Sequence, residues 1–304
     1  MNLTNSPFSV SNKIAYQYWR ERKLKNFSND INTLMVTIDD ISHLQQNEIN
    51  TLFRLINRYN LALYRFKNPH STPAKNKQKV TQLAKHFGLN RLDKNICADK
   101  DKLTSITVSE HKGQHQYIPY SNKRLSWHTD GYYNAPDQQI HALVLHCEHP
   151  AQSGGESLLL DHEIAYILLR DENPDYIKAL SHPNAMSIPA NILNGKEIRP
   201  AQSGPVFSIN TTGGLHMRYS ARTRNIQWRQ DSMTLEAVTF LQNLWKSNSP
   251  YILRYTLQAH EGLLCKNILH CRTAFKDNKN PKKKRLLYRG RYFDQFQSKI
   301  ESKP

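Results

Sequence analysis

The chain carries the stretch Trp127-His128-Thr129-Asp130, which places an imidazole and a carboxylate two residues apart. On an extended strand, residues two positions apart project from the same face, so His128 and Asp130 can hold one cation between them. A third candidate ligand, His270, stands at the end of an apolar run in the last part of the chain. Two neutral imidazoles and one carboxylate leave coordination positions open, which is the facial triad that binds non-haem Fe(II). The pattern therefore predicts that these three residues are the metal ligands and the catalytic centre.

Further motifs follow in order along the chain. They are Gly154-Gly155-Glu156-Ser157, Leu269-His270-Cys271-Arg272 and Arg285-Leu286-Leu287-Tyr288-Arg289. Together with residues 126–131, they resemble the taurine dioxygenase (TauD/TfdA) family over roughly residues 30 to 294, nearly the whole chain. The resemblance implies a double-stranded β-helix (jelly roll, cupin-like) core and a dependence on Fe(II), 2-oxoglutarate and O2.

The resemblance also implies an oxidoreductase, a 2-oxoglutarate-dependent non-haem iron dioxygenase. Such an enzyme hydroxylates or desaturates an unactivated C–H bond and releases succinate and CO2. Related halogenating enzymes replace the carboxylate ligand by a small residue, so the presence of Asp130 favours oxygenation. The substrate is expected to be small and anionic: an amino acid, a sulfonate or a carboxylate.

By the same resemblance, Arg285 binds the distal carboxylate of 2-oxoglutarate, and the Ser157 hydroxyl adds a hydrogen bond where the family more often has threonine. A guanidinium matches a carboxylate bidentately and stays charged when it is partly buried. The spacing from His270 to Arg285 is a little longer than in the taurine enzyme, so Arg289 is an alternative cofactor-binding residue. In that enzyme the second arginine meets the anionic group of the substrate, which makes Arg289 a substrate-binding candidate as well.

Other substrate-binding candidates lie near the metal ligands or in a basic segment. Trp127 and Tyr132 flank the ligands, although aromatic residues beside a site often serve packing. Arg218 and Arg222 could reach a carboxylate, with a structural salt bridge as the alternative.

The composition is that of a globular protein, with 304 residues, 38% hydrophobic and 22% charged. The sequence shows no apolar run of membrane-spanning length and no signal peptide, and its four cysteines show no Cys-x-x-Cys spacing. We therefore expect a cytoplasmic enzyme that acts on a small molecule and does not bind membranes. A homo-oligomer is left open.

The net charge of +17 allows other partners. Its densest run, Lys282-Lys283-Lys284-Arg285, is most simply a solvated loop, with anion binding next and nucleic acid the least favoured. One alternative function is a basic nucleic-acid- or protein-binding module with a vestigial metal site. Another is a jelly-roll enzyme that uses a different metal without 2-oxoglutarate, and the position of Arg285 counts against it.

Hydrophobic periodicity predicts helices over residues 47–59, 80–87 and 237–245, and a further helix capped by Asp161. Residues 68–79 are expected to form a loop, and residues 251–257 and 263–269 the closing strands. Many short strands with a few helices favour a mainly β (α+β) jelly roll. Residues 1–30 are interpreted as an N-terminal arm and residues 31–304 as a single dioxygenase domain.

The stretch His146-Cys147-Glu148-His149 superficially resembles a metal cluster. Strand alternation places His146 with Glu148 on one face and Cys147 with His149 on the other. We therefore interpret the stretch as the end of a strand without a binding function.

Overall fold

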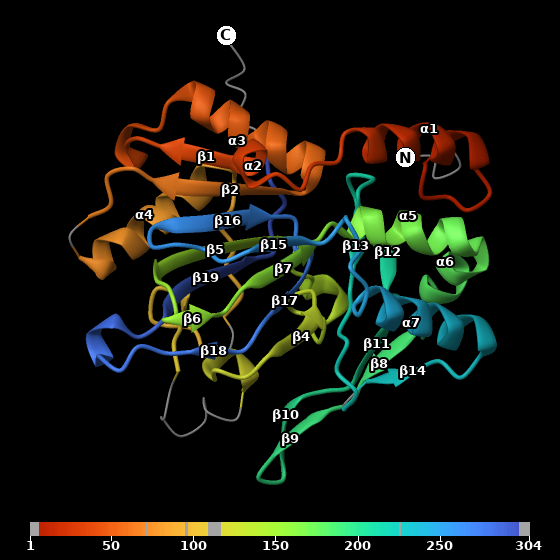
Figure 1. Cartoon of the computed structure of the whole chain (residues 1–304). Coiled ribbons are helices and arrows are strands. Elements are labelled where there is room, and N and C mark those ends of the chain that lie inside the picture. Colours follow the sequence, from red (N-terminus) through yellow and green to blue (C-terminus); the bar gives the residue numbers. More distant parts are fainter. Residues whose placement is uncertain (1–5, 71, 95–96, 109–116, 225, 298–304) are drawn as a thin grey trace. The chain divides into compact units, whose positions relative to one another are not determined.

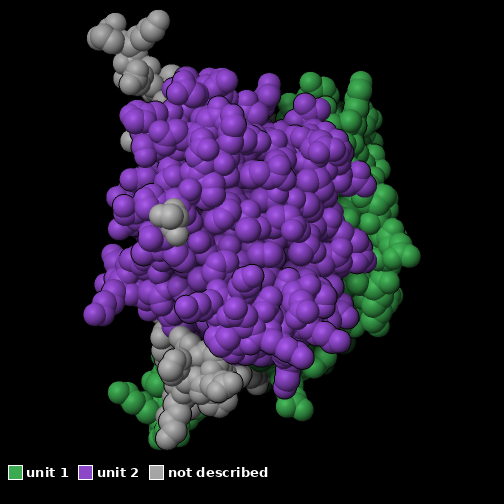
Figure 2. Space-filling view, turned by 60° about the vertical axis from the view of Figure 1, so that its left-hand side comes forward, with its two compact units in different colours: residues 1–27, 126–139, 160–252 green, residues 28–125, 140–159, 253–304 purple. Residues whose placement is uncertain are grey.

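A computed structural model describes residues 6–70, 72–94, 97–108, 117–224 and 226–297 of the chain. These residues form two units, which Figure 1 shows as ribbons and Figure 2 colours separately. Unit 1 is built from residues 1–27, 126–139 and 160–252, and unit 2 from residues 28–125, 140–159 and 253–304. Each unit thus draws together three stretches that are far apart in the sequence.

Unit 2 contains a six-stranded sheet. Its strands lie in the order β1 (Met35–Ile38), β2 (Leu61–Phe66), β16 (Glu261–Cys265), β5 (Ala142–His149), β19 (Leu286–Tyr292) and β3 (Thr104–Ile106) (Figure 1). Strands β1 and β2 pair in parallel, while the other neighbours are antiparallel. Strand β5 is buried along most of its length, so it lacks the alternation of a half-exposed strand.

Helix α3 (Gln46–Tyr59) packs against this sheet and follows the short helix α2 (Ile31–Leu34) and strand β1. Its residues Leu52, Leu55 and Ile56 recur at helical spacing and are buried. The helix predicted over residues 47–59 is therefore confirmed.

Helix α4 (Pro73–His86) also packs against the sheet, next to β5. It begins at Pro73, so the prediction of a loop over residues 68–79 was wrong for its second half. Proline suits the first turn of a helix, where its missing N–H removes no helical hydrogen bond. The proline therefore marks a helix start and not a loop.

A second sheet of unit 2 places β7 (Ser157–Leu160) between β15 (Leu253–Tyr255) and β17 (Leu269–Arg272). Leu159 and Leu253 from this sheet join the core of the six-stranded sheet, so the two sheets share one hydrophobic core. The short strands β6 (Ser153–Gly154) and β18 (Phe275–Lys276) pair after β5 and β17. The expected class, mainly β with flanking helices, is confirmed.

The prediction of one strand over residues 263–269 was wrong. The chain forms β16 and β17 as separate strands, with Asn267 between them at a φ of 47°. Asparagine tolerates this left-handed conformation, and its Nδ2 donates to the carbonyl oxygen of Ile140 at 2.7 Å. The turn moves the chain from one sheet to the other and so places His270 on β17.

Unit 1 is rich in helices and short strands. They are α1 (Lys13–Lys25), α5 (His162–Glu172), α6 (Pro174–Leu180), α7 (Ser232–Leu244), β8 (Met186–Ile188), β9 (Asn191–Leu193), β10 (Lys196–Arg199), β11 (Gln202–Gly204), β12 (Phe207–Ile209), β13 (Leu215–Met217) and β14 (Gln227–Trp228). Asp161 caps α5 as predicted, and Lys23 of α1 contacts Asp161 and Glu163 at 2.6 and 2.5 Å. Of the expected arm and domain, residues 1–5 and 298–304 lie outside the described residues.

The remaining elements are short. Strand β4 (Leu125–His128) enters unit 1 at Ser126. Single-turn 3-10 helices occur at η2 (Ile41–His43), η3 (Ile118–Tyr120), η4 (Pro136–Gln138) and η5 (Pro281–Lys283). The four cysteines, all among the described residues, are buried and form no disulfide. In the described part of the chain, every helix is too short or too polar to cross a membrane.

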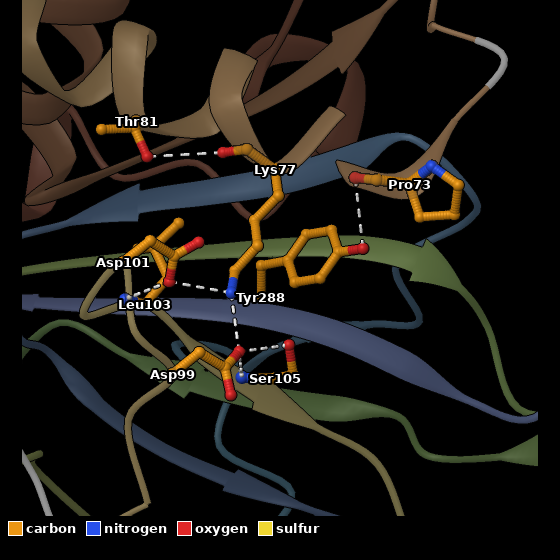
Figure 3. A network of polar contacts seen from close by, with 8 residues as sticks. All are labelled: Pro73, Lys77, Thr81, Asp99, Asp101, Leu103, Ser105 and Tyr288. Atoms are coloured by element: carbon orange, nitrogen blue, oxygen red, sulfur yellow. Dashed lines mark hydrogen bonds and ion pairs between the residues drawn. The ribbon is translucent and has the colours of Figure 1, made fainter. Parts of the chain in front are cut away.

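A polar network holds α4 to the segment that precedes β3 (Figure 3). The Nζ of Lys77 contacts Asp99 at 2.6 Å and Asp101 at 2.9 Å, and the Ser105 hydroxyl donates to Asp99 at 2.6 Å. The Lys77 side chain is only 12% exposed and lies over the ring of Tyr288. One partly buried cation thus joins a helix, a loop and a strand.

We predict that Lys77→Met lowers the free energy of unfolding by about 1 kcal/mol, because it leaves two carboxylates without their shared cation. The control is Lys178→Met, which removes an ion pair to Asp175 whose side chains are 64% and 54% exposed. That change should alter stability by less than roughly 0.5 kcal/mol. Urea unfolding measures both values, and equal effects would contradict the importance of the Lys77 network.

Candidate active site

His128 and Asp130 lie in unit 1, at and just beyond the end of strand β4. Both are buried, and His128 Nε2 is 4.0 Å from Asp130 Oδ1. Thr129 between them donates its N–H to the carbonyl oxygen of Tyr219 at 3.0 Å, and its Oγ1 accepts from the Tyr219 N–H at 3.1 Å. Gly131 follows at a φ of 68°, which turns the chain directly after the carboxylate. The two side chains thus approach each other, although Asp130 lies in the turn after β4 and not on the strand that the spacing argument assumed.

The imidazole of His128 is fixed by its own backbone. Its Nδ1 lies 2.8 Å from the carbonyl oxygen of Ser126. Because a carbonyl oxygen only accepts hydrogen bonds, Nδ1 carries the proton and donates it. In the neutral ring the lone pair is then on Nε2, the nitrogen 4.0 Å from Asp130. Metal-bound histidines commonly make such a hydrogen bond, since it sets the tautomer and the ring orientation.

His270 lies in unit 2, on β17, and is half-buried. Its Nδ1 lies 2.9 Å from the carbonyl oxygen of Ile268, again two residues earlier in the chain. The same argument places the lone pair of His270 on Nε2. Both predicted histidine ligands therefore have the tautomer that binds a metal through Nε2. Two such nitrogens and a buried carboxylate form a donor set that fits Fe(II).

Arg285 and Ser157 line one pocket within unit 2. Ser157 begins β7 and Arg285 directly precedes β19, so both sheets of the unit contribute to it. The pocket is also lined by Cys147, Thr256, Leu257 and Leu287 and by the glycines at 154 and 155. Of the two arginines considered for 2-oxoglutarate, Arg285 is the one that lines this pocket with Ser157.

The guanidinium of Arg285 is buried and remains charged. Burial lowers the pKa of Arg285 to about 10, which is still above neutral pH. Its guanidinium carbon lies 5.0 Å from the ring centre of Phe275, and its backbone N–H donates to Asp277. With the described residues, the guanidinium itself makes neither a hydrogen bond nor an ion pair. Its donors are thus suited to a carboxylate that enters the pocket.

The double-glycine turn shapes the same pocket. Gly154 and Gly155 have φ values of 73° and 75°, which glycine adopts without strain. A Cβ at Gly154 would lie 2.4 Å from the carbonyl oxygen of Ala274, closer than any real contact. A Cβ at Gly155 would lie 3.6 Å from Arg285 Nε. The turn therefore needs glycine at 154 to pack against β18.

Arg289 lies on β19, two residues beyond Leu287. Alternate residues of a strand share a face, so Arg289 projects from the face that carries Leu287 and the pocket. It is buried and stands opposite Leu145 of β5 and Thr104 of β3.

The aromatic candidates have different surroundings. Trp127 is buried and stacks on Trp245 with ring centres 4.9 Å apart, so its contacts support the packing alternative. Tyr132 is half-buried, and its ring stands edge-on to that of His128 at 6.5 Å. Tyr132 is therefore the aromatic residue beside the candidate ligands.

The two arginines of the basic segment also differ. Arg218 is buried and donates to the backbone carbonyl oxygens of Tyr132, Met186, Gln202 and Gly204 at 2.7 to 3.3 Å. Arg218 therefore ties loops and strands of unit 1 together through carbonyl groups, which is a structural role but not the salt bridge considered as an alternative. Arg222 is exposed, and its Nη1 donates to the Tyr132 hydroxyl at 3.4 Å.

The sequence interpretation did not assign Thr256 or Cys147 to the pocket. Thr256 follows β15 and contributes a hydroxyl, and Cys147 lies on β5. Burial raises the pKa of Cys147 to about 12, so the thiol is neutral. Alternation along β5 was a signal for Cys147, because it separates this residue from His146 and Glu148.

Comparison with known proteins agrees with these features. The sequence model of the family described as "Taurine catabolism dioxygenase TauD, TfdA family" matches residues 22–291. A uridine-5'-phosphate dioxygenase from Amycolatopsis sp. is 32% identical over 94 residues, which are 31% of this chain. The match spans 33%, about a third, of the length of that relative.

Solved structures share the fold at low sequence identity. Asparagine oxygenase with Fe(II), a hydroxyasparagine and succinate has a TM-score of 0.59 and 13% identity, over 85% of this chain and 93% of that chain. The non-haem iron oxygenase OrfP with Fe and α-ketoglutaric acid has a TM-score of 0.59 and 16% identity, over 83% and 81%. A taurine dioxygenase from Burkholderia xenovorans has a TM-score of 0.56 and 16% identity, over 86% of each chain. The expected double-stranded β-helix core is thereby confirmed.

We predict that Gly154→Ala lowers the free energy of unfolding and distorts the turn that lines the pocket of Arg285, because the new Cβ would clash with the Ala274 carbonyl oxygen. Gly195→Ala is the matched control: its φ is also positive, at 76°, but a Cβ there has open space. The control should lose only about 1 to 2 kcal/mol from the left-handed backbone, and Gly154→Ala clearly more. Thermal and urea unfolding compare them, and equal losses would contradict the steric argument.

Proposed function

This chain belongs to the TauD, TfdA family and is a non-haem iron, 2-oxoglutarate-dependent dioxygenase, and we propose that His128, Asp130 and His270 bind its Fe(II). Arg285 and Ser157 bind the distal carboxylate of 2-oxoglutarate. The substrate is a small anionic molecule of the amino-acid class, hydroxylated at an unactivated C–H bond. The observation that carries the proposal is the pair of hydrogen bonds that gives both histidines a lone pair on Nε2.

The proposed ligand side chains are preorganised for metal binding. The carbonyl oxygens of Ser126 and Ile268 accept from Nδ1 of the two imidazoles, so binding of a metal through Nε2 requires no change of tautomer. Asp130 supplies the negative charge from a buried position, where little water competes for the cation. This combination supports Fe(II) over a hard cation such as Mg²⁺, which prefers oxygen ligands.

The pocket of unit 2 positions the cosubstrate. Arg285 can form two parallel hydrogen bonds with a carboxylate, and the Ser157 hydroxyl can donate a third. Leu257 and Leu287 give the pocket apolar walls that exclude water and strengthen these bonds. Bound iron, with 2-oxoglutarate and O2, supplies the oxidising chemistry. The residues of this chain supply orientation and a dry environment.

Charge and position support an anionic substrate. Tyr132 stands edge-on to His128, and the exposed Arg222 reaches the Tyr132 hydroxyl, so a cation and a phenol lie next to the candidate ligand. Arg289 is the second arginine on the pocket face of β19. Structural relatives carry hydroxyasparagine or hydroxyarginine in their complexes, and another is a taurine dioxygenase. An amino acid or a related small acid fits these observations.

Asp130→Ala is the direct test of the centre. We expect it to abolish iron- and 2-oxoglutarate-dependent succinate formation, because the metal would lose its only anionic ligand among the three. Asp137→Ala, which changes an exposed carboxylate in η4, should retain wild-type activity. Succinate is measured with Fe(II)-loaded protein, 2-oxoglutarate and O2, with and without asparagine, arginine, taurine and uridine 5'-phosphate. Full turnover by Asp130→Ala would refute the assignment of the centre.

Arg285→Gln and Arg289→Gln separate the two arginine roles. Loss of the Arg285 guanidinium removes charged hydrogen bonds to the cosubstrate, so the KM for 2-oxoglutarate should rise roughly a hundredfold. Arg289→Gln should leave that KM nearly unchanged and raise the KM for the substrate. Steady-state kinetics with varied 2-oxoglutarate and varied substrate measure both KM values. A raised KM for 2-oxoglutarate in Arg289→Gln and not in Arg285→Gln would exchange the two roles.

A further inference from the structure

A second group of potential metal ligands lies entirely within unit 2. His146 and Glu148 project from β5, and His260 lies in the turn before β16. One ligand atom from each residue can be chosen so that all three atoms lie within 4.8 Å of one another. The donor set is again two imidazoles and one carboxylate. None of these residues lines the pocket of Arg285.

The group is buried and has unused donor and acceptor atoms. His146 is fully buried, and Glu148 is 3% exposed. Three buried atoms, His146 Nε2, Glu148 Oε2 and His260 Nδ1, have no hydrogen-bond partner in the described part of the chain. Buried polar atoms are nearly always partnered, so three such atoms from one cluster need an explanation.

The other atoms of the strand residues are engaged and fix the side chains. Glu148 Oε1 accepts a hydrogen bond from Asn76 Nδ2 at 3.1 Å, and His146 Nδ1 lies 3.1 Å from the Tyr64 hydroxyl. Asn76 is itself buried and is bound to the backbone N–H and carbonyl of His70. Outer hydrogen bonds of this kind orient metal ligands.

Aromatic rings hold the His146 imidazole in place. Tyr64 and Tyr288 stack on it, with interplanar angles of 14° and 2° and ring centres 5.8 and 6.3 Å away. Tyr288 is fixed in turn by its hydroxyl, which donates to the carbonyl oxygen of Pro73, and by Lys77 over its ring (Figure 3). Burial and the nearby His260 lower the pKa of His146 to about 3, so the imidazole is neutral.

The backbone of His260 is held in an uncommon conformation. Its φ is 66°, in the left-handed region that residues other than glycine seldom adopt. Its N–H donates to the carbonyl oxygen of Cys147 at 2.7 Å, and its carbonyl oxygen accepts from the N–H of Phe66 at 3.0 Å. Such conformations persist where the surroundings enforce them, often at functional sites. Here they bring the imidazole to the two ligands on β5.

We propose that His146, Glu148 and His260 bind one divalent transition-metal ion such as Zn(II), separate from the iron centre. The ion bonds to two imidazole nitrogens and one carboxylate oxygen, and water completes the coordination. The half-buried His260 gives the ion access from solvent. The ion links the turn before β16 to β5, whose opposite face carries Cys147 of the cosubstrate pocket. Its role is structural.

The test counts bound zinc per chain after equilibration with Zn(II) and removal of excess, by elemental analysis. Wild type should hold about two ions, because the iron centre also accepts Zn(II). Glu148→Gln should hold one ion fewer, since it keeps the shape and the acceptor for Asn76 but loses the charge. His260→Asn should also lose one, because asparagine tolerates the left-handed backbone but cannot reach the ion. His149→Asn, which changes a neighbouring histidine outside the cluster, should match wild type.

A second readout detects the structural role. Chelation of Asp130→Ala, which lacks the proposed iron ligand, should lower its Tm, and chelation of the Asp130→Ala/Glu148→Gln double variant should not. Zinc content equal to wild type in both Glu148→Gln and His260→Asn would overturn the proposal. If wild type binds a single zinc ion, and that ion is lost in Glu148→Gln but kept in Asp130→Ala, the result would support this second site. The same result would contradict the proposed iron centre.

Discussion

The hydrogen bond from an imidazole Nδ1 to a backbone carbonyl two residues earlier is the interaction on which the proposed iron centre depends. It occurs at His128 and again at His270, in two different units of the chain. The backbone thereby decides which nitrogen of each ring carries a lone pair, and no other side chain is needed. Strand β4 places the carbonyl group of Ser126, and the change of sheet at Asn267 places that of Ile268.

The hydrogen-bond partners of a buried arginine indicate whether it has a structural role or could bind a ligand. The guanidinium of Arg218 donates hydrogen bonds to four backbone carbonyl oxygens. The guanidinium of Arg272 donates to the backbone carbonyl oxygens of Ser121 and Lys123. Arg285 is equally buried but lines a pocket with Ser157. Burial lowers the pKa of all three to about 10, so each stays charged at neutral pH. Of these three arginines, Arg285 is the one that lines this pocket.

Several features of the fold and the site could be predicted from the sequence because they depend on residues close together in the chain. The family, the enzyme class, the jelly-roll core and the helix predicted over residues 47–59 are confirmed. They follow from short motifs, from the family resemblance that these motifs carry, or from helical spacing. The start of α4 at Pro73 and the break at Asn267 were missed, because a proline or an asparagine alone does not reveal which backbone conformation tertiary contacts select.

The remaining features depend on contacts between distant segments. The four carbonyl partners of Arg218 carry no sequence signature, so the sequence offered only a substrate carboxylate or a salt bridge as its partner. His146 and Glu148 were correctly assigned to one face of a strand, but the third member, His260, lies more than a hundred residues later. Sequence alone could not show that its turn returns to β5. The proposed second site would give this stretch a binding function that its sequence alone did not indicate.

The ligands of the proposed iron centre can be identified by X-ray absorption at the iron edge of anaerobic, Fe(II)-loaded Glu148→Gln protein. That variant lacks the charged ligand of the second cluster, so the spectrum would report the centre of His128, Asp130 and His270. We predict two imidazole nitrogens and a carboxylate oxygen among the ligands of the iron. A coordination shell of oxygen atoms without imidazole would contradict it.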